Sequence, residues 1–236
     1  NFGNPEDPNI MGQFAECVQG IKEACEFLDY PVVSGNVSFY NGTNKKNIYP
    51  TPVIGGVGLI KEVKKKINHF FKKENSLVLV IGKTFGHLSQ SALYNEVFSL
   101  DKGPPPDVNL LNEKNNGEIV YKLIHQGLVN SVHDISSGGI IIALAEMSIN
   151  SKIGIKIEKP KKLSNLFEFF YGEDQGRYIV ELNQDKFEKV KDLLKDNDIF
   201  FESIGITQKD NFELKEEIKI NIKELCEINN KWYYNY

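Results

Sequence analysis

Apolar positions in the first sixty residues change from helical to strand spacing. Over residues 11–28 they recur at every third or fourth position, which predicts an amphipathic helix, and Asp7 followed by proline is typical of its start. Residues 31–35 and 53–60 are short apolar segments that favour strands, with the proline-rich turn of residues 49–52 before the second one. Glycines inside the second segment indicate a bulge or a close backbone approach.

Beyond a lysine-rich connection over residues 61–74, apolar runs of strand length alternate with amphipathic segments. Strands are expected at residues 77–81, 132–135, 153–157, 178–182 and 200–206. Helices are expected at residues 89–98, 118–128, 140–149, 161–170 and 186–194. The last stretch favours a strand over residues 212–222 and then a helix near Leu225. Alternating strands and helices predict a sheet covered by helices, in an α+β arrangement.

Composition and charge narrow the class of protein. The 236 residues are 41% hydrophobic and 25% charged, which is ordinary for a soluble globular protein of one large or two small domains. The net charge of −4 disfavours a nucleic-acid surface, and no apolar run approaches the roughly 20 residues that cross a membrane. With three cysteines outside metal-ligand spacing and no signal peptide, we expect a cytoplasmic protein. The first residue, Asn1, indicates an amino end that is processed, cut or truncated.

Two clusters of ligand-binding residue types lie near the amino end. In the first, Gly35 permits close backbone approach, and alternation places Asn36 and Ser38 on one face of an extended segment. That face could present an oxygen to Mg²⁺ and a hydroxyl to a phosphate or polar substrate, although a plain turn has the same composition. The second cluster, residues 1–8, leads into a helix whose amino end could hold an anion or could simply be capped.

Two further clusters lie in the second half of the chain. Residues 133–139 form a strand-to-helix junction, where Asp134 could bind a metal and the glycines could cradle phosphate. A tight turn with an oriented histidine explains the same residues. Residues 172–177 form a carboxylate-rich turn that alone is typical of a surface hairpin. It contains Arg177, which is the only arginine beside 27 lysines, so anions must be bound mainly through lysine, backbone amides or metal.

Taken together, these motifs resemble the carboxy-terminal half of the large subunit of phosphoribosylformylglycinamidine synthase (synthase II). The resemblance covers about residues 1–207 and keeps the chain order of all motifs. The similar segments are residues 1–6, 32–41, 48–52, 133–139 and 143–146. The ten-residue run at 32–41 is the most specific of them.

The resemblance implies two domains of the aminoimidazole ribonucleotide synthetase-like superfamily. Residues 1–61 would be the end of a barrel-forming, dimerisation-type domain. Residues 62–236 would be a helix-covered, mixed-sheet α+β domain, whose tail after about residue 207 has no counterpart among the motifs.

The resemblance also implies a reaction in purine biosynthesis. Formylglycinamide ribonucleotide, ATP and glutamine-derived ammonia would become formylglycinamidine ribonucleotide, ADP and phosphate, with Mg²⁺ neutralising the nucleotide phosphates. The implied partners are the first half of the same enzyme, a glutaminase subunit and a small accessory subunit. The family's catalytic histidine lies in a His-Asn-His-Pro motif of the first half, which none of the four histidines here matches. We therefore expect no catalytic residue in this fragment, and an inactive fragment on its own.

Carried over residue by residue, the family pattern assigns ATP contact to Gly35, a Mg²⁺ oxygen to Asn36 and substrate contact to Ser38. In this half an auxiliary nucleotide site is implied, outlined by Asp134, Ser136, Gly138, Gly139, Glu173 and Arg177. Two alternatives stay open at this stage. One is a related ATP-dependent enzyme such as aminoimidazole ribonucleotide synthetase or selenophosphate synthetase. The other is a non-catalytic assembly module that holds a structural nucleotide.

Overall fold

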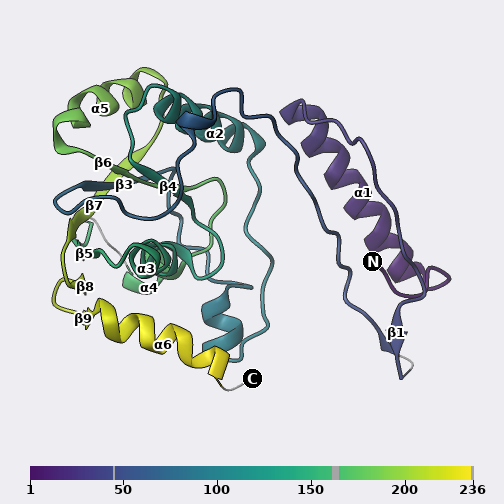
Figure 1. Ribbon diagram of the computed structural model, residues 1–236. Helices are drawn as coiled ribbons and strands as arrows, with labels where there is room; N and C mark the ends of the chain where they lie inside the picture. Colours follow the sequence, from purple (N-terminus) through teal and green to yellow (C-terminus); the bar gives the residue numbers. More distant parts are fainter. Residues whose placement is uncertain (45, 161–164, 235–236) are drawn as a thin grey trace. The chain divides into compact units, whose positions relative to one another are not determined.

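A computed structural model describes residues 1–44, 46–160 and 165–234 of the chain (Figure 1). Its internal contacts divide it into two compact units, Asn1–Lys61 (unit 1) and Glu62–Tyr236 (unit 2). No helix in the described ranges is both long and apolar enough to cross a bilayer.

Unit 1 is built around one long helix, α1 (Pro8–Leu28). The Asp7 side chain accepts a hydrogen bond from the backbone N–H of Asn9, so the predicted cap and helix are both confirmed. A short hairpin of β1 (Gly42–Thr43) and β2 (Lys46–Asn47), which the sequence analysis missed, follows.

Three aromatic rings hold the amino end of unit 1 together. The centroids of Phe2 and Phe14 are 5.3 Å apart, and those of Phe14 and Phe39 are 5.0 Å apart, both in edge-to-face arrangements. Phe2 is buried, and its backbone N–H donates to the carbonyl of Ser38 at 2.9 Å. The chain start is therefore anchored to the segment that carries the Asn36 motif.

The two strands expected in unit 1 do not form ladders within the described residues. Residues 31–35 and 53–60 run without strand pairing, and Val33 and Val57 are 89% and 88% exposed. This prediction was wrong for a physical reason: apolar, β-branched sequence favours a strand only when a neighbouring strand accepts and donates its hydrogen bonds.

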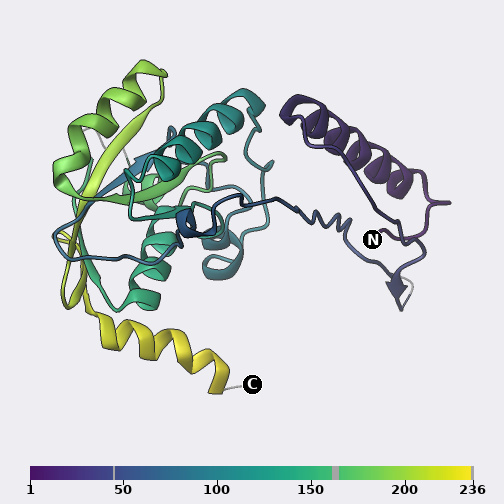
Figure 2. The ribbon, with the colours of Figure 1, turned by 45° about the horizontal axis from the view of Figure 1, so that its top comes forward.

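Unit 2 contains one seven-stranded sheet with the strand order β4-β6-β3-β7-β5-β8-β9 (Figures 1 and 2). The strands are β3 (Leu77–Ile81), β4 (Ser131–Asp134), β5 (Gly154–Ile157), β6 (Tyr178–Leu182), β7 (Phe201–Gln208), β8 (Asn211–Leu214) and β9 (Ile218–Asn221). All neighbours are antiparallel except the parallel pair β5 and β8, which makes the sheet mixed.

Helices cover both faces of this sheet. Side chains of α2 (Leu110–His125) and α5 (Phe187–Asp196) pack on one face, and those of α3 (Gly139–Ser151), α4 (Leu166–Tyr171) and α6 (Ile222–Tyr234) on the other. Successive residues of β3 alternate between the two cores: Val78 and Val80 join the α3 side, whereas Leu79 and Ile81 join the α2 side. A strand buried on both faces is uniformly apolar, which explains the continuous run in the sequence.

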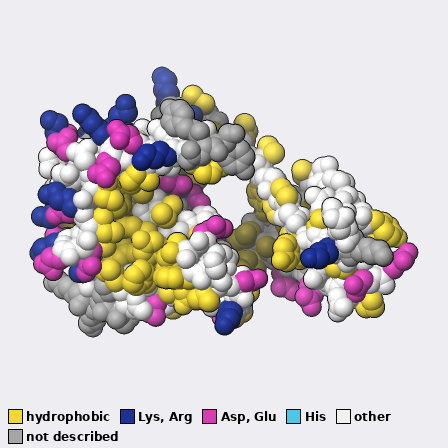
Figure 3. Space-filling view, turned by 90° about the horizontal axis from the view of Figure 1, so that it is seen from below, with side chains coloured by type: hydrophobic (Ala, Val, Ile, Leu, Met, Phe, Trp, Pro, Cys, Tyr) yellow, Lys and Arg dark blue, Asp and Glu magenta, His cyan; other side chains and the backbone are white. Residues whose placement is uncertain are grey.

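Some apolar surface of unit 2 remains exposed. Figure 3 shows hydrophobic side chains gathered on the face seen from below, where Figure 1 places α4 and α6. Phe167 of α4 is 50% exposed, and Ile228 of α6 is 52% exposed. Apolar patches of this kind are common at interaction sites.

Several boundaries differ from the predictions for local reasons. The helix expected at 118–128 begins at Leu110, where Asn109 caps it by accepting from the N–H of Asn112. The helix expected at 89–98 is only a π-helical turn, Leu93–Val97. The start of the helix expected at 161–170 lies outside the described residues, and α4 begins at Leu166. The strand expected at 212–222 is a hairpin, because the chain reverses between β8 and β9.

The remaining short helices are 3₁₀ turns, Val63–Lys65 and Gln184–Lys186. The first lies in the lysine-rich connection, for which no helical turn was predicted.

Gly154 provides a test of the sheet packing. A Cβ at this position would lie 2.1 Å from the backbone oxygen of Asn211, so we expect Gly154→Ala to lower the free energy of unfolding by at least about 2 kcal/mol. Gly117→Ala, at a position inside α2, is the matched control. Its Cβ would lie 3.7 Å from the Tyr178 hydroxyl, an ordinary van der Waals distance. Because alanine favours a helix more than glycine does, the free energy of unfolding of this control should rise by up to about 1 kcal/mol. Urea denaturation measures both variants. Equal stability of the Gly154 variant and the wild type would contradict the close approach of β5 and β8.

Candidate functional site

The Gly35–Asn36–Ser38 motif is anchored at one end and open at the other. The Ser38 carbonyl accepts from the side-chain amide of Asn41 at 3.0 Å, and the same amide donates to the Ser38 hydroxyl at 3.2 Å. Gly35 and Asn36 are exposed, and within the described residues no atom lies within 4 Å of a Cβ built on Gly35. The Asn36 side chain is therefore accessible to a ligand, while Ser38 is fixed by its own neighbours.

Four of the other predicted residues, Asp134, Ser136, Glu173 and Arg177, meet in unit 2 around a cleft of about 360 Å³. The cleft lies where β4 ends and β6 begins. It is lined by Glu113, Asp134, Ile135, Ser136, Ser137, Glu173, Gln175, Gly176, Arg177 and Tyr178. The side chains of Asp134, Ser136 and Ser137 are exposed there and face solvent. They are the groups that a ligand can reach first.

The two other predicted residues, Gly138 and Gly139, form the turn into α3 that follows the cleft residues Ser136 and Ser137. Gly138 and Gly139 have positive φ angles of 81° and 71°, which L-residues adopt only with strain. A Cβ on Gly139 would also lie 2.7 Å from the carbonyl oxygen of Phe170. Backbone geometry and packing therefore account for both glycines without a ligand.

Glu173 is bonded to the backbone of two other segments. Its Oε1 atom accepts from the N–H groups of Ala92 and Gly138, each at 2.7 Å. The Gly138 N–H was among the donors expected to cradle a phosphate, and here a carboxylate already occupies it. Glu173 thus ties the α3 turn to the segment before the π-helical turn.

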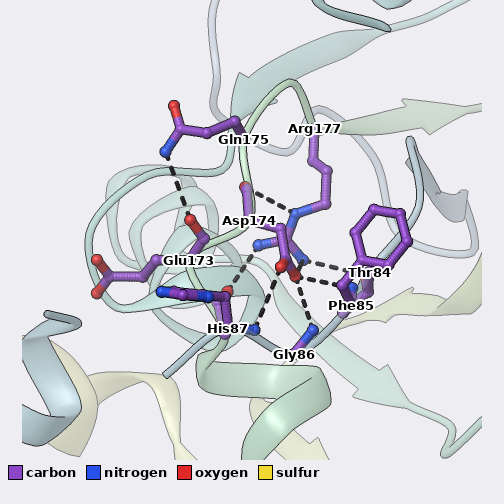
Figure 4. A network of polar contacts seen from close by, with 9 residues as sticks. Thr84, Phe85, Gly86, His87, Glu173, Asp174, Gln175 and Arg177 are labelled. Carbon is purple, nitrogen blue, oxygen red and sulfur yellow. Dashed lines mark hydrogen bonds and ion pairs between the residues drawn. The ribbon is translucent and has the colours of Figure 1, made fainter. Parts of the chain in front are cut away.

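Arg177 is directed into the protein interior (Figure 4). It is 1% exposed, and its guanidinium donates to the Gly172 carbonyl at 2.6 Å, the Asp174 carbonyl at 3.0 Å and the Thr84 hydroxyl at 3.0 Å. Burial lowers the pKa of Arg177, and the nearby carboxylates of Asp174 and Glu173 oppose that shift. All three guanidinium nitrogens have protein acceptors, so the arginine acts as an internal tie.

Asp174 holds the turn that follows β3. Its Oδ2 accepts from the N–H groups of Phe85 and Gly86 at 2.9 Å, and its Oδ1 accepts from that of His87 at 3.2 Å. The Arg177 guanidinium lies 3.7 Å from Oδ2 as an ion pair. Three backbone donors and one cation therefore compensate a carboxylate that is 5% exposed.

The electrostatics of the cleft are set by carboxylates. Burial raises the pKa of Glu113, and burial together with Glu113 and Asp134 raises the pKa of the Tyr178 phenol. In the described part of the chain, no three His, Cys, Asp or Glu side chains are placed to hold a metal ion. A ligand with a bare negative charge would be repelled here.

Sequence reasoning missed three contributors to this site. Glu113 lies in the part of α2 that was not expected to be helical, and Thr84 and Asp174 act through contacts between distant segments. Of the three, only Asp174 lies in a segment that the sequence singled out, the carboxylate-rich turn of residues 172–177. The assignment of the auxiliary nucleotide site itself stays a prediction.

The Asp174 network gives a stability prediction. Asp174→Ala should lower the free energy of unfolding by about 3–5 kcal/mol, because it leaves a buried guanidinium without its counter-charge and three N–H groups without their acceptor. The exposed neighbour Gln175 is the control, and Gln175→Ala should change it by no more than about 0.5 kcal/mol. Chemical denaturation measures both. A small loss in the Asp174 variant would show that the turn relaxes around the lost carboxylate.

Comparisons with known proteins support a common ancestry along the whole chain. Residues 1–60 match the family model "AIR synthase related protein, N-terminal domain", and residues 72–215 match "AIR synthase related protein, C-terminal domain". The chain is 46% identical to phosphoribosylformylglycinamidine synthase subunit PurL of Pelagibacter ubique, over 100% of this chain and 32% of that protein. The corresponding protein of Rhodopseudomonas palustris (strain BisB5) is 42% identical over the same shares.

Solved structures agree on the fold. T. maritima PurL complexed with FGAR has a TM-score of 0.58 at 14% identity, covering 70% of this chain and 30% of that one. T. maritima PurL complexed with ATP has a TM-score of 0.55 at 12% identity, with coverages of 70% and 28%. The expected α+β fold class is confirmed, and the chain spans about a third of the length of the curated relatives it matches. Because the larger match alone covers more than half of its residues, the chain belongs to the AIR synthase related protein family.

Proposed function

We propose that this chain is the carboxy-terminal part of a phosphoribosylformylglycinamidine synthase of purine biosynthesis. The observation that carries the proposal is the 46% identity to PurL of Pelagibacter ubique across every residue of the chain. The chain matches only 32% of that relative, so the activity is proposed for a longer protein. Within it, residues 1–61 would complete a barrel-forming domain, and residues 62–236 would form the helix-covered domain.

In this proposal the intact enzyme is an ATP-dependent carbon–nitrogen ligase. The γ-phosphoryl group of ATP moves to the amide oxygen of formylglycinamide ribonucleotide, and ADP leaves. Ammonia then adds to the amide carbon that carries this oxygen, and the oxygen departs as part of the phosphate. Structures titled as T. maritima PurL complexed with ATP, with ADP and with FGAR support both ligand classes for this fold.

Within unit 1 the proposed ligand contacts are Gly35 for ATP, Asn36 for Mg²⁺ and Ser38 for the ribonucleotide. The accessibility of Asn36 fits one neutral oxygen ligand, which suffices when nucleotide phosphates carry the remaining coordination. Mg²⁺ would neutralise phosphate charge when bound. Gly35 leaves room for close approach, and Ser38 is fixed by the Asn41 amide, as a specificity contact requires.

For unit 2 we propose an auxiliary nucleotide site in the cleft at Asp134. The exposed side chains of Asp134 and Ser136 would contact the ligand. The backbone turns next to these side chains would be held in place by residues that already contact other parts of the protein: Gly138, Gly139, Glu173 and Arg177. This division assigns direct contact to exposed groups and a structural role to buried ones.

The proposed partners are the first half of the same enzyme, a glutaminase subunit and a small accessory subunit that deliver ammonia, in the cytoplasm. A structure titled "Structure of PurLQS from Thermotoga maritima" resembles this chain at a TM-score of 0.53 and 13% identity, which supports an assembly of this kind.

Asn36 is the first residue to test. In the intact enzyme, Asn36→Ala should lower kcat by at least about tenfold, equal to roughly 1.4 kcal/mol of barrier, because one metal oxygen is lost. Folding should be unaffected, since the side chain is exposed. Asn9→Ala, another exposed asparagine of unit 1, is the control and should keep wild-type turnover. Full turnover of the Asn36 variant at saturating magnesium would remove the metal role.

The 236-residue chain alone should be inactive. Phosphoryl transfer requires nucleotide, metal and acceptor to be positioned together, and the proposal gives this chain only the Gly35, Asn36 and Ser38 side of that arrangement. The test incubates the purified chain with formylglycinamide ribonucleotide, Mg-ATP and ammonium and measures ADP, with a full-length relative as positive control. Substrate-dependent ADP release above a mock preparation would place the whole catalytic site within these residues.

A further inference from the structure

The connection that enters β3 lies along the open side of β4, which is the edge strand of the sheet. The carbonyl of Asn68 accepts from the N–H of Val132 in β4 at 3.2 Å. Three residues later Phe71 is 2% exposed within the α3-side core, and its N–H donates to the Met147 carbonyl at 3.4 Å. The connection therefore covers an edge that would otherwise be free to pair with other strands.

A buried carboxylate holds the next two residues of the connection. Glu181 in β6 is 0% exposed; its Oε2 accepts from the N–H of Lys72 at 2.9 Å and its Oε1 from that of Lys73 at 3.1 Å. The Ser131 hydroxyl donates to Oε2 at 2.8 Å. Among the described residues no side-chain cation forms an ion pair with this carboxylate, so these three donors compensate its charge.

A histidine holds the connection at a second point. The His133 ring lies between two carboxylates, with Nε2 2.9 Å from Glu146 and Nδ1 3.2 Å from Asp134. Its centroid is 4.8 Å from that of His69, which belongs to the connection. The His69 ring in turn packs edge-on against Phe70 at 4.4 Å.

These groups share one face of neighbouring strands. Ser131 and His133 are two residues apart in β4 and point to the same side, and Ser131 is paired in register with Glu181 of β6. A core that needed only stability would place apolar side chains at these positions, because burying an unpaired carboxylate is costly. The polar groups here instead receive the backbone and one ring of the connection, which favours a role in fixing its position.

We propose that Ser131, His133 and Glu181 are positioning residues that clamp residues 67–75 onto β4. The clamp fixes the point at which the connection reaches the sheet before it enters β3. Because His133 also contacts Asp134, it links that point to the cleft at the end of the same strand.

Proton binding should loosen this clamp. Burial, and then the neighbouring His133, lower the pKa of His69, while Glu146 and Asp134 act in the opposite direction and Lys72 adds to the lowering. A folded-state pKa below the unfolded one means that the unfolded chain binds more protons, so stability is lost as the pH falls below about 6.5. Protonation would place a positive charge on the partly buried His69 ring, whose centroid lies 4.8 Å from that of His133.

Amide hydrogen exchange of the 236-residue chain, expressed as protection relative to intrinsic rates, tests the clamp. Glu181→Gln should lower protection of the Lys72 and Lys73 amides by about tenfold or more, because a charged acceptor becomes a neutral one. Ser131→Ala should give a smaller loss at the same amides. Glu188→Gln, an exposed carboxylate of α5 paired with Lys191, is the control and should change neither.

The location and pH dependence of the effect decide between positioning and general stability. The loss should be confined to residues 67–75, whereas an equal loss across β3 and β7 would overturn the proposal. Between pH 7.5 and 5.5 the wild type should lose protection in this segment, and His69→Phe, which keeps a ring without a charge, should not. If Glu181→Gln does not fold, the His69 comparison carries the test. Identical pH profiles in wild type and His69→Phe would also overturn the proposal.

Discussion

The ion pair between Asp174 and Arg177 fixes the end of the sheet at which the cleft forms. The two residues lie in the turn before β6, and β6 pairs with β3 so that Tyr178 stands opposite Ile81. The turn after β3 therefore comes next to the turn before β6. Arg177 ties its own turn together through Gly172 and reaches across to Thr84, while Asp174 accepts the N–H groups of the neighbouring turn. One short segment thus determines the course of two loops.

Burying the charges of Asp174 and Arg177 costs free energy of desolvation, which explains why both groups are surrounded by hydrogen-bond partners. Charges taken out of water stabilise a fold only when their hydrogen bonds are satisfied and their partners are close. Here the carboxylate has three backbone donors and the guanidinium has three oxygen acceptors. The net gain in stability over an apolar pair is small, but the geometry permits few alternatives. Glu173 holds the turn before α3 in the same way, by accepting from the N–H of Gly138. The shape of the cleft therefore follows from polar contacts within the protein.

Sequence analysis succeeded where burial imposes a pattern. The bounds of β3 and β6 were predicted because both strands are buried on two faces and form continuous apolar runs. The first turns of α2 were missed because Asn112, Asn115 and Asn116 give them a polar, turn-like composition. The strands of unit 1 were expected from propensity, yet pairing depends on neighbours that propensity does not encode.

The sequence predicted which residue types form the candidate site, but not whether their side chains point to solvent or into the protein. The motif around Asp134 was recognised from its residue types, and the structure places its residues 134–137 in the lining of one cleft. Whether an arginine reaches outward to an anion or inward to carbonyls depends on contacts between segments far apart in sequence, and for Arg177 the contacts point inward. Glu181 had no local signal at all, because its partners at Lys72 and Lys73 are more than a hundred residues away.

The charge of the cleft restricts what it can hold. Glu113, Asp134 and Glu173 line it, and its one arginine is already bound to backbone carbonyls. A phosphate without a counterion would meet carboxylates and few free donors, since Glu173 occupies the Gly138 N–H. In the nucleotide site that we propose, a cation that arrives with the phosphates would offset this repulsion. For the nucleotide site that we propose here, the acidic lining would favour a nucleotide accompanied by a cation over the free nucleotide.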